Sequence, residues 1–250
     1  MKKIFPPMNN CLGTGHVFCI FVYWIFAFVL FPFLMPVIGY GLWDDLRVMS
    51  WVECGYYLIN GFVLTRVMKE HLADALFELK IDPKSVWGTV GITCALMLIW
   101  MSLVRRIWSV LCLFIVGTPL PLDVFPMSEM AVALTGGLLV EYNPIFGMIC
   151  LTLVTPFSIC GFFYATGFSK VCYQNPKLAY WSLILVLLLP ALFEVFWRGD
   201  AFYVFLYFVL RLPIHLFACW SYQKTDNIWT PIFSLGIFNL LTSVMVLVMY

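Results

Sequence analysis

The stretch YQKTDNIWTPIFSLGIFN, residues 222–239, decides the fold of this chain. It opens on a short polar turn at residues 223–227, which lies between two apolar runs. Lys224, Asp226 and Asn227 are costly to place in hydrocarbon, so the turn is expected at the membrane surface. The stretch therefore predicts that one spanning helix ends just before the turn and that another begins just after it.

The helix after the turn has a recognisable beginning. Trp229 suits the membrane–water interface, and Pro231 suits the first turn of a helix, where its missing N–H costs no hydrogen bond. The apolar run at residues 228–249 is long enough to cross a bilayer, which takes about 20 residues. We therefore predict a spanning helix that begins beside Trp229.

Composition places the rest of the chain in the membrane as well. Of its 250 residues, 63% are hydrophobic and 11% are charged, and the formal net charge is +1. A soluble domain of this length has too little interior for so much apolar surface, so lipid must act as the solvent. We expect no nucleic-acid partner, because the sequence has no basic patch. The nine cysteines lack the spacing of a metal site, so we expect neither a metal nor a cofactor.

Seven apolar runs are candidates for spanning helices. They lie at residues 17–41, 51–68, 87–104, 144–164, 178–195, 201–222 and 228–249. Two weaker segments, 107–122 and 130–140, are either an extra span or a re-entrant or interfacial piece. The prediction is an all-α polytopic transmembrane bundle of seven spans, with eight possible, that forms a single membrane-embedded domain over residues 1–250.

The distribution of lysine and arginine orients this bundle. With a cytoplasmic N-terminus most of these residues fall on inner segments, and Arg105 and Arg106 are the discordant pair. The segment KEHLADALFELKIDPKS, residues 69–85, is the one extended polar stretch. We predict that it forms an amphipathic cytoplasmic helix that stops at Asp82 and Pro83. The first apolar run is too long for a signal peptide, so we treat it as a retained span.

The polar turn and the helix after it resemble a known family of membrane proteins. The sequence YQKTDNIWTPI at residues 222–232 is similar to the Tyr-Leu-Arg-Thr-Gly-Ser-Ile-Trp-Ala-Pro-Ile of CPBP (Abi, CAAX-protease-like) intramembrane endopeptidases. The resemblance covers residues 144–250 and implies a CPBP-like core there. It also implies a site inside the bundle, where a carboxylate and imidazoles activate water for peptide hydrolysis.

Counting from the shared turn places the family's motifs on this chain. In the last helix the family's His-x-x-x-Asn falls on Leu235 and Asn239, so the amide is kept and the imidazole is absent. The remaining motif positions hold residues without charge: Ile159, Cys160, Tyr164, Leu187 and Ala191. This register predicts a family site that has lost its ionisable groups.

A second placement of the site keeps ionisable groups. Glu194 and Arg198 fit a Glu-x-x-x-Arg motif, and with His215 and Asn239 they would supply a carboxylate, an imidazole and an amide. Spacing disfavours this placement, because only about thirty residues separate Arg198 from Trp229, and the family fits another helix of about 20 residues there. Glu194 and Arg198 also suit an ordinary i,i+4 pair at the end of a span.

Arg211 is an unusual residue because it falls inside the predicted span 201–222, where a charge costs at least about 2.5–3.5 kcal/mol. His215 lies one turn further along the same helical face, and Pro213 between them loosens the backbone. The pair is either a polar pocket for an anionic ligand, or an arginine that reaches the interface or bonds to exposed carbonyls.

Three hypotheses for the function follow. The first is a catalytically inactive CPBP-like pseudoprotease that acts as a membrane scaffold, regulator or partner-binding subunit. The second is an active CPBP-type endopeptidase for peptide or bacteriocin processing or immunity, and the third is a transporter or transporter partner that uses Arg211 and His215. The expected partners are the lipid bilayer and another membrane protein or exported peptide. The expected compartment is a bacterial cytoplasmic membrane.

Overall fold

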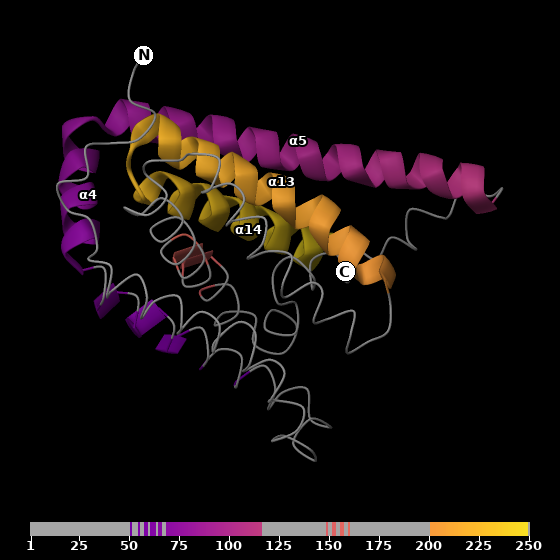
Figure 1. Cartoon of the computed structure of the whole chain (residues 1–250), viewed down its shortest axis with the longest axis horizontal. Helices are drawn as coiled ribbons and strands as arrows, with labels where there is room; N and C mark the ends of the chain where they lie inside the picture. The colour runs from indigo at the N-terminus through magenta and orange to yellow at the C-terminus, as the bar shows by residue number, and fades with distance from the viewer. Residues whose placement is uncertain are drawn as a thin grey trace.

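The computed structural model describes residues 69–116 and 201–249, together with isolated positions between 51 and 66 and between 149 and 160. This part of the chain is helical and contains no strand. Its helices are α4 (Lys69–Ile81), α5 (Pro83–Val116), α13 (Ala201–Thr225) and α14 (Trp229–Met249), as Figure 1 shows. The predicted all-α class is confirmed for these residues, whereas the number of spans stays a prediction.

One helix of the described part, α5, is long and apolar enough to cross a membrane. Its segment Pro83–Val104 has 22 residues, which is about 33 Å of helix against a hydrocarbon core of about 30 Å. The helix then continues to Val116. The predicted span 87–104 and the first part of the weaker segment 107–122 therefore belong to one continuous helix that includes Arg105 and Arg106. Arginine is a good helix former, and the first helix breaker after the pair is Gly117.

The remaining predicted spans are tested only in part. The described positions between 51 and 66 are α-helical, which agrees with a helix at 51–68. The described positions between 149 and 160 are helical too, with π-helical turns, which agrees with a helix at 144–164. The predicted spans 17–41 and 178–195 and the segment 130–140 lie outside the described residues.

The junction between α4 and α5 is a sharp corner at Asp82. The backbone N–H of Asp82 donates to the carbonyl oxygen of Glu78 (3.1 Å), and the Asp82 carboxylate accepts from the N–H of Ser85 (3.2 Å). Pro83 occupies the first position of α5, where proline costs no hydrogen bond. The predicted stop at Asp82 and Pro83 is thus confirmed, and α4 lies crosswise to α5 (Figure 1).

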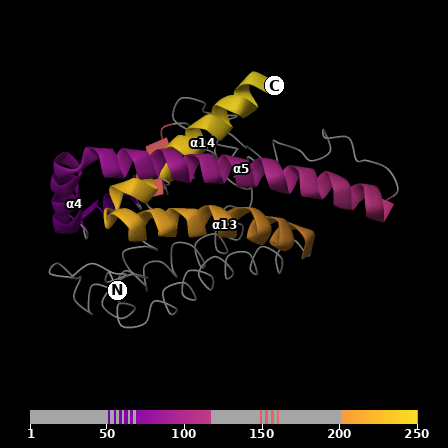
Figure 2. The same ribbon diagram turned by 90° about the horizontal axis from the view of Figure 1, so that it is seen from above.

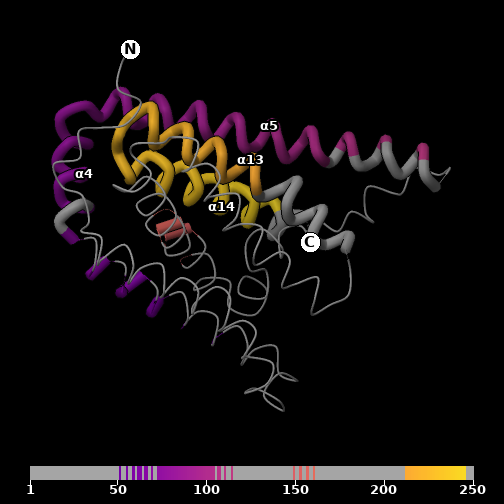
Figure 3. Tube along the Cα trace, viewed as in Figure 1, coloured from indigo at the N-terminus to yellow at the C-terminus, as the bar shows by residue number. Residues whose placement is uncertain are grey.

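Helices α5, α13 and α14 pack together and bury the core of the described part. Its most completely buried side chains include Met97 of α5, Ala218 of α13 and Phe238 of α14. Figure 2 shows that α13 runs beside α5, whereas α14 crosses α5 and diverges from α13 toward the C-terminus. Figure 3 traces the same path and shows α4 at the end of the bundle where α13 meets α14.

Candidate functional site

The turn between α13 and α14 is tighter than the sequence predicts. Residues 223–225 belong to α13, and only Asp226 and Asn227 separate its end from the turn that opens α14. Asp226 has a φ of 57°, and its N–H donates to the carbonyl oxygen of Tyr222 (2.7 Å). This left-handed residue closes α13, a conformation that aspartate tolerates better than most residues. The predicted turn at 223–227 is therefore too long.

Asn227 caps α14 and also anchors the turn to α4. Its side-chain oxygen accepts from the N–H of Trp229 (2.9 Å), and its amide nitrogen donates to the carbonyl oxygen of Ala75 (2.6 Å). The side chain is only 1% exposed, so both bonds are made away from water, where losing a partner is costly. A second bond from the same turn joins the indole N–H of Trp229 to the carbonyl oxygen of Leu72 (3.2 Å).

These two bonds define what we call the α4 latch: Asn227 to Ala75 and Trp229 to Leu72. Leu72 and Ala75 are three residues apart and are both buried, so they form the face of α4 that covers the hairpin. The latch therefore fixes the predicted amphipathic helix against the last helical pair by polar contacts as well as by apolar packing.

An aromatic cluster lies beside the latch. The Phe233 ring stacks on Trp87 of α5 (centroids 5.0 Å apart) and on Trp229 (5.6 Å), and Phe157 lies 6.3 Å from Trp229. Stacked aromatic pairs contribute about 0.5–1.5 kcal/mol beyond their burial. The cluster therefore joins α5, α14 and the region around residue 157 at the end of the bundle where α4 lies.

The structure describes several titratable groups outside the predicted spans. Among those at this end of the bundle, Asp226 has a shifted pKa. Partial burial of its carboxyl, and then the charge of Glu78 on α4, raise its pKa from 3.8 to about 7. Part of the Asp226 side chain remains exposed to solvent. Its charge therefore changes near neutral pH beside the latch.

Two residues of the predicted sites, His215 on α13 and Asn239 on α14, are buried in the bundle, with exposed fractions of 5% and 7%. Each lies twelve residues from Asn227, or about 18 Å along its helix. Both side chains have interaction partners within the chain. His215 and Asn239 are equally far from the turn along their helices. However, α14 diverges from α13 (Figure 2), so this equal distance does not place the two side chains next to each other.

Leu235 and Cys160 are the other positions of the family register that the structure describes, and both are buried. Cys160 lies near Cys219 of α13, and both cysteines are buried and free. The other positions of both placements lie outside the described residues: Ile159, Tyr164, Leu187, Ala191, Glu194 and Arg198. Arg211 lies on α13, but its side chain is outside the described part.

Hydroxyl groups inside the bundle bond to the backbone of their own helices. Ser234 donates to the carbonyl oxygen of Thr230 (2.8 Å), and Thr93 donates to that of Thr89 (2.8 Å). Such bonds satisfy a polar group at low cost in an apolar environment. We therefore assign these hydroxyls a structural role. The described residues hold no group of three metal-ligating side chains.

Gly236 is a packing residue that the sequence analysis does not single out. A Cβ atom at this position would collide with the carbonyl oxygen of Thr152 and would touch Pro156. The backbone of α14 thus approaches the π-helical turn near residue 152 as closely as only glycine allows. A glycine within an apolar run indicates that another backbone can approach closely. It does not indicate which segment of the chain approaches.

No protein-family model matches the chain, and no curated protein or solved structure matches it either.

Proposed function

We propose that the chain is a membrane-embedded, catalytically inactive CPBP-like protein that binds a partner inside or beside its bundle. The observation that carries the proposal is Leu235, because an apolar side chain is packed where the resemblance implies a catalytic histidine. An aliphatic side chain can neither accept a proton nor ligate a metal. Cys160, in the place of a carboxylate, is buried as well.

The surrounding contacts support a role in binding. The α4 latch and the close approach at Gly236 hold α14 in a fixed position. A rigid helical pair is a suitable frame for a partner helix, since binding then costs little ordering. The proposed partner is another membrane protein or an exported peptide, in a bacterial cytoplasmic membrane.

A cleavage assay tests the absence of catalysis. The full chain is reconstituted in lipid nanodiscs and offered prenylated CAAX peptides and hydrophobic peptides, with Glu194→Ala as the matched variant. We expect no cleavage above the level of that variant. Cleavage by the unaltered chain that is lost in a folded Glu194→Ala variant would show an active endopeptidase.

A second experiment tests the binding role. The tagged chain is cross-linked in its native membranes, and co-purified proteins are quantified by mass spectrometry for the unaltered chain, Asn239→Leu and Gly88→Ala. We expect one membrane partner that Asn239→Leu loses and Gly88→Ala keeps, because no atom lies within 4 Å of a Cβ at Gly88. Equal recovery of all co-purified proteins from the three chains would contradict the proposal.

The burial of His215 favours an active endopeptidase as the second candidate, because a buried imidazole inside a bundle is a suitable general base. In that case His215→Ala and Asn239→Ala each lower the cleavage rate, by about 10²–10⁴-fold for the base. Unchanged cleavage in His215→Ala would remove this candidate.

A further inference from the structure

Helix α4 presents an apolar strip on the side away from the hairpin. At about 100° per residue, Phe77 lies almost opposite the midpoint between Leu72 and Ala75, which are buried against the hairpin. Phe77 is 66% exposed, and Ile81, one turn further along the same row, is 68% exposed. Ala73, one turn before Phe77, is exposed as well. We call Ala73, Phe77 and Ile81 the outer strip.

Carboxylates border the outer strip along one edge. Asp74 and Glu78 are exposed and four residues apart, and each lies within about 60° of Ile81 in the helical register. Neither has a lysine or arginine three or four residues away on α4, so the helix does not neutralise them itself. Partial burial and then the charge of Glu78 raise the pKa of Asp226, so Glu78 lies close to a further carboxyl in the neighbouring turn.

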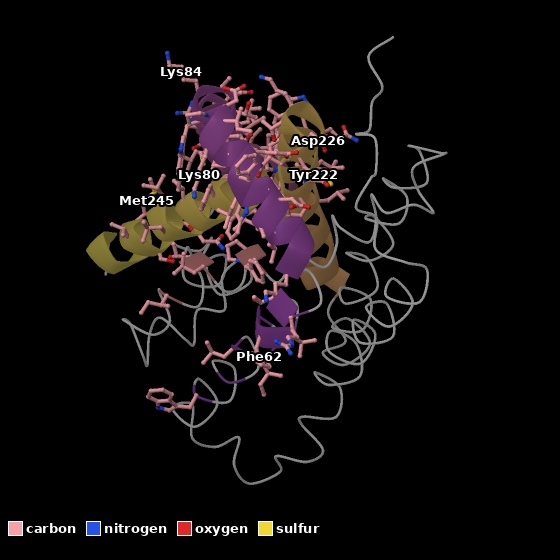
Figure 4. All side chains as sticks on the ribbon, turned by 90° about the vertical axis from the view of Figure 1, so that its left-hand side faces the viewer. Phe62, Lys80, Lys84, Tyr222, Asp226 and Met245 are labelled. Atoms are coloured by element: carbon pink, nitrogen blue, oxygen red, sulfur yellow. The ribbon has the colours of Figure 1, made fainter. Side chains whose placement is uncertain are left out.

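The other edge of the outer strip carries a lysine. In the helical register Lys80 lies about 60° from Phe77, on the side away from Asp74, and it is exposed. Figure 4, which looks onto α4, shows Lys80 and Asp226 on opposite sides of this helix. The outer strip therefore has an edge with two carboxylates and an edge with one ammonium group, and its partner must match both.

A second copy of the chain does not match these edges. Helix α4 lies crosswise to α5, the helix that is long enough to span a membrane (Figure 1). In a closed dimer, copies inserted in the same sense are related by a two-fold axis along the membrane normal, which makes the two α4 helices antiparallel. Equivalent edges then face each other, so Asp74 and Glu78 would meet their own counterparts. Such like-charge contacts oppose a dimer through the outer strip.

The acidic edge also disfavours lipid as the cover of the outer strip. The anionic headgroups of a cytoplasmic leaflet attract lysine and arginine and repel carboxylates. A polypeptide helix, by contrast, can place apolar side chains against Phe77 and Ile81 and a cation beside Glu78. The α4 latch already fixes the strip, so binding of such a helix costs little ordering on this side.

We propose that the outer strip binds an amphipathic helix of another protein, with lysine or arginine along the edge that meets Asp74 and Glu78. This inference rests on the proposed binding role and names a surface and a partner for it. Phe77 and Ile81 pack on the apolar face of that helix, and Ala73 leaves room for a large side chain of the partner. The charges at the edge set the direction of the bound helix and contribute little affinity.

Model helices test this recognition on the full chain. Two fluorescent amphipathic peptides of equal length share a leucine face and carry either lysine or glutamate along one edge. Their binding is measured on the chain in phosphatidylcholine nanodiscs, with empty discs as the background. We expect the lysine peptide to bind about fivefold or more tightly than the glutamate peptide. Phe77→Ala should weaken its binding by about tenfold, whereas Ile99→Ala, at a 63% exposed position of α5, should not.

A charge reversal tests the role of the acidic edge. The double variant Asp74→Lys/Glu78→Lys should prefer the glutamate peptide, because the charges at the edge are then opposite. Equal affinities for the two peptides, or a preference that survives the reversal, would overturn the proposal. Asn239→Leu should leave peptide binding unchanged. Peptide binding that is lost in Asn239→Leu and unaffected by Phe77→Ala would overturn the outer strip but keep the proposed binding role.

Photocross-linking in native membranes identifies the occupant of the outer strip. The full chain carries p-benzoyl-phenylalanine in place of Phe77 or, as the matched control, of Ile99. Adducts are digested and their peptides are sequenced by mass spectrometry. We expect position 77 to give a peptide of another protein with lysine or arginine beside an apolar face at helical spacing, and position 99 to give lipid. A lipid adduct, a peptide of this chain, a peptide without that pattern, or no adduct at position 77 would overturn the proposal.

Discussion

At the scale of single residues, Asn227 joins three elements of the described part: the turn, α14 and α4. One side chain caps α14 through its oxygen and reaches α4 through its nitrogen. Both bonds are made at a buried position, where an unsatisfied backbone group costs about 1–3 kcal/mol. The residue therefore links the local geometry of the turn to the placement of a helix 152 residues away in sequence.

We predict that Asn227→Ala lowers the free energy of unfolding by about 2 kcal/mol, because it removes the cap and the bond to Ala75. Thermal or denaturant unfolding of the chain in detergent measures the loss. Asn227→Ser is the control, since serine also caps helices and removes only the amide donor to Ala75, so its loss should be smaller. Equal stability of Asn227→Ala and the unaltered chain would contradict this role.

The second prediction at this scale concerns pH. The carboxyl of Asp226 has a folded-state pKa of about 7 against 3.8, so the folded chain binds this proton more tightly than the unfolded chain does. Its contribution to stability is fully present below about pH 4 and is lost as the pH rises toward 7. We expect Asp226→Asn to remove this part of the pH dependence and to raise the melting temperature most above pH 7.

The measurement for Asp226 is the difference in melting temperature between the unaltered chain and Asp226→Asn from pH 5 to pH 8. Asparagine also tolerates the φ of 57° at this position, so the substitution adds no strain to the backbone. A difference that stays constant over this range would show that Asp226 does not titrate there.

At the scale of the elements, the packing of α14 is set by one glycine. Any side chain at Gly236 meets the backbone of Thr152, which cannot move aside as a flexible side chain would. We predict that Gly236→Ala lowers the free energy of unfolding by about 1–3 kcal/mol, as overpacking does. Unfolding in detergent measures it.

Gly88→Ala and Gly91→Ala are the controls for this substitution. Both glycines lie in α5, and a Cβ at either position meets nothing within 4 Å. Alanine is favoured over glycine inside a helix by up to about 1 kcal/mol, so both controls should be neutral or stabilising. A Gly236→Ala chain as stable as these controls would show that α14 shifts away from Thr152 at no cost.

At the scale of the whole molecule, the length of α5 predicts that its two ends lie on opposite sides of the membrane. Its 34 residues make about 51 Å of helix, more than the hydrocarbon core of about 30 Å. The corner with α4 and the turn between α13 and α14 lie together at one end (Figure 1), and the far part of α5 extends away from them.

We predict that Lys84→Cys and Lys224→Cys react with a membrane-impermeant maleimide from the cytoplasmic side, whereas Phe114→Cys reacts from the outer side. All three residues are exposed. The unaltered chain gives the background, which should be low for the cysteines buried in the structure, Cys94, Cys160 and Cys219. Labelling of positions 84 and 114 from the same side would show that α5 does not cross the membrane.

The sequence by itself determined the local features of this protein. The apolar runs at 201–222 and 228–249, the stop at Asp82 and Pro83, and the polar turn before Trp229 all correspond to elements of the structure. Helix caps and apolar runs depend on residues that are near neighbours, so their patterns can be read along the chain. The sequence also selected His215 and Asn239, which are buried in the bundle.

Only the tertiary structure decided how these elements meet. The bond from Asn227 to Ala75 and the contact of Gly236 with Thr152 join residues that are remote in sequence. The continuation of α5 past Arg105 was not predicted either, because a charged pair marks a membrane boundary as readily as it continues a helix. Partners across such distances are chosen by packing and by hydrogen-bond satisfaction in three dimensions, and no local pattern in the chain encodes them.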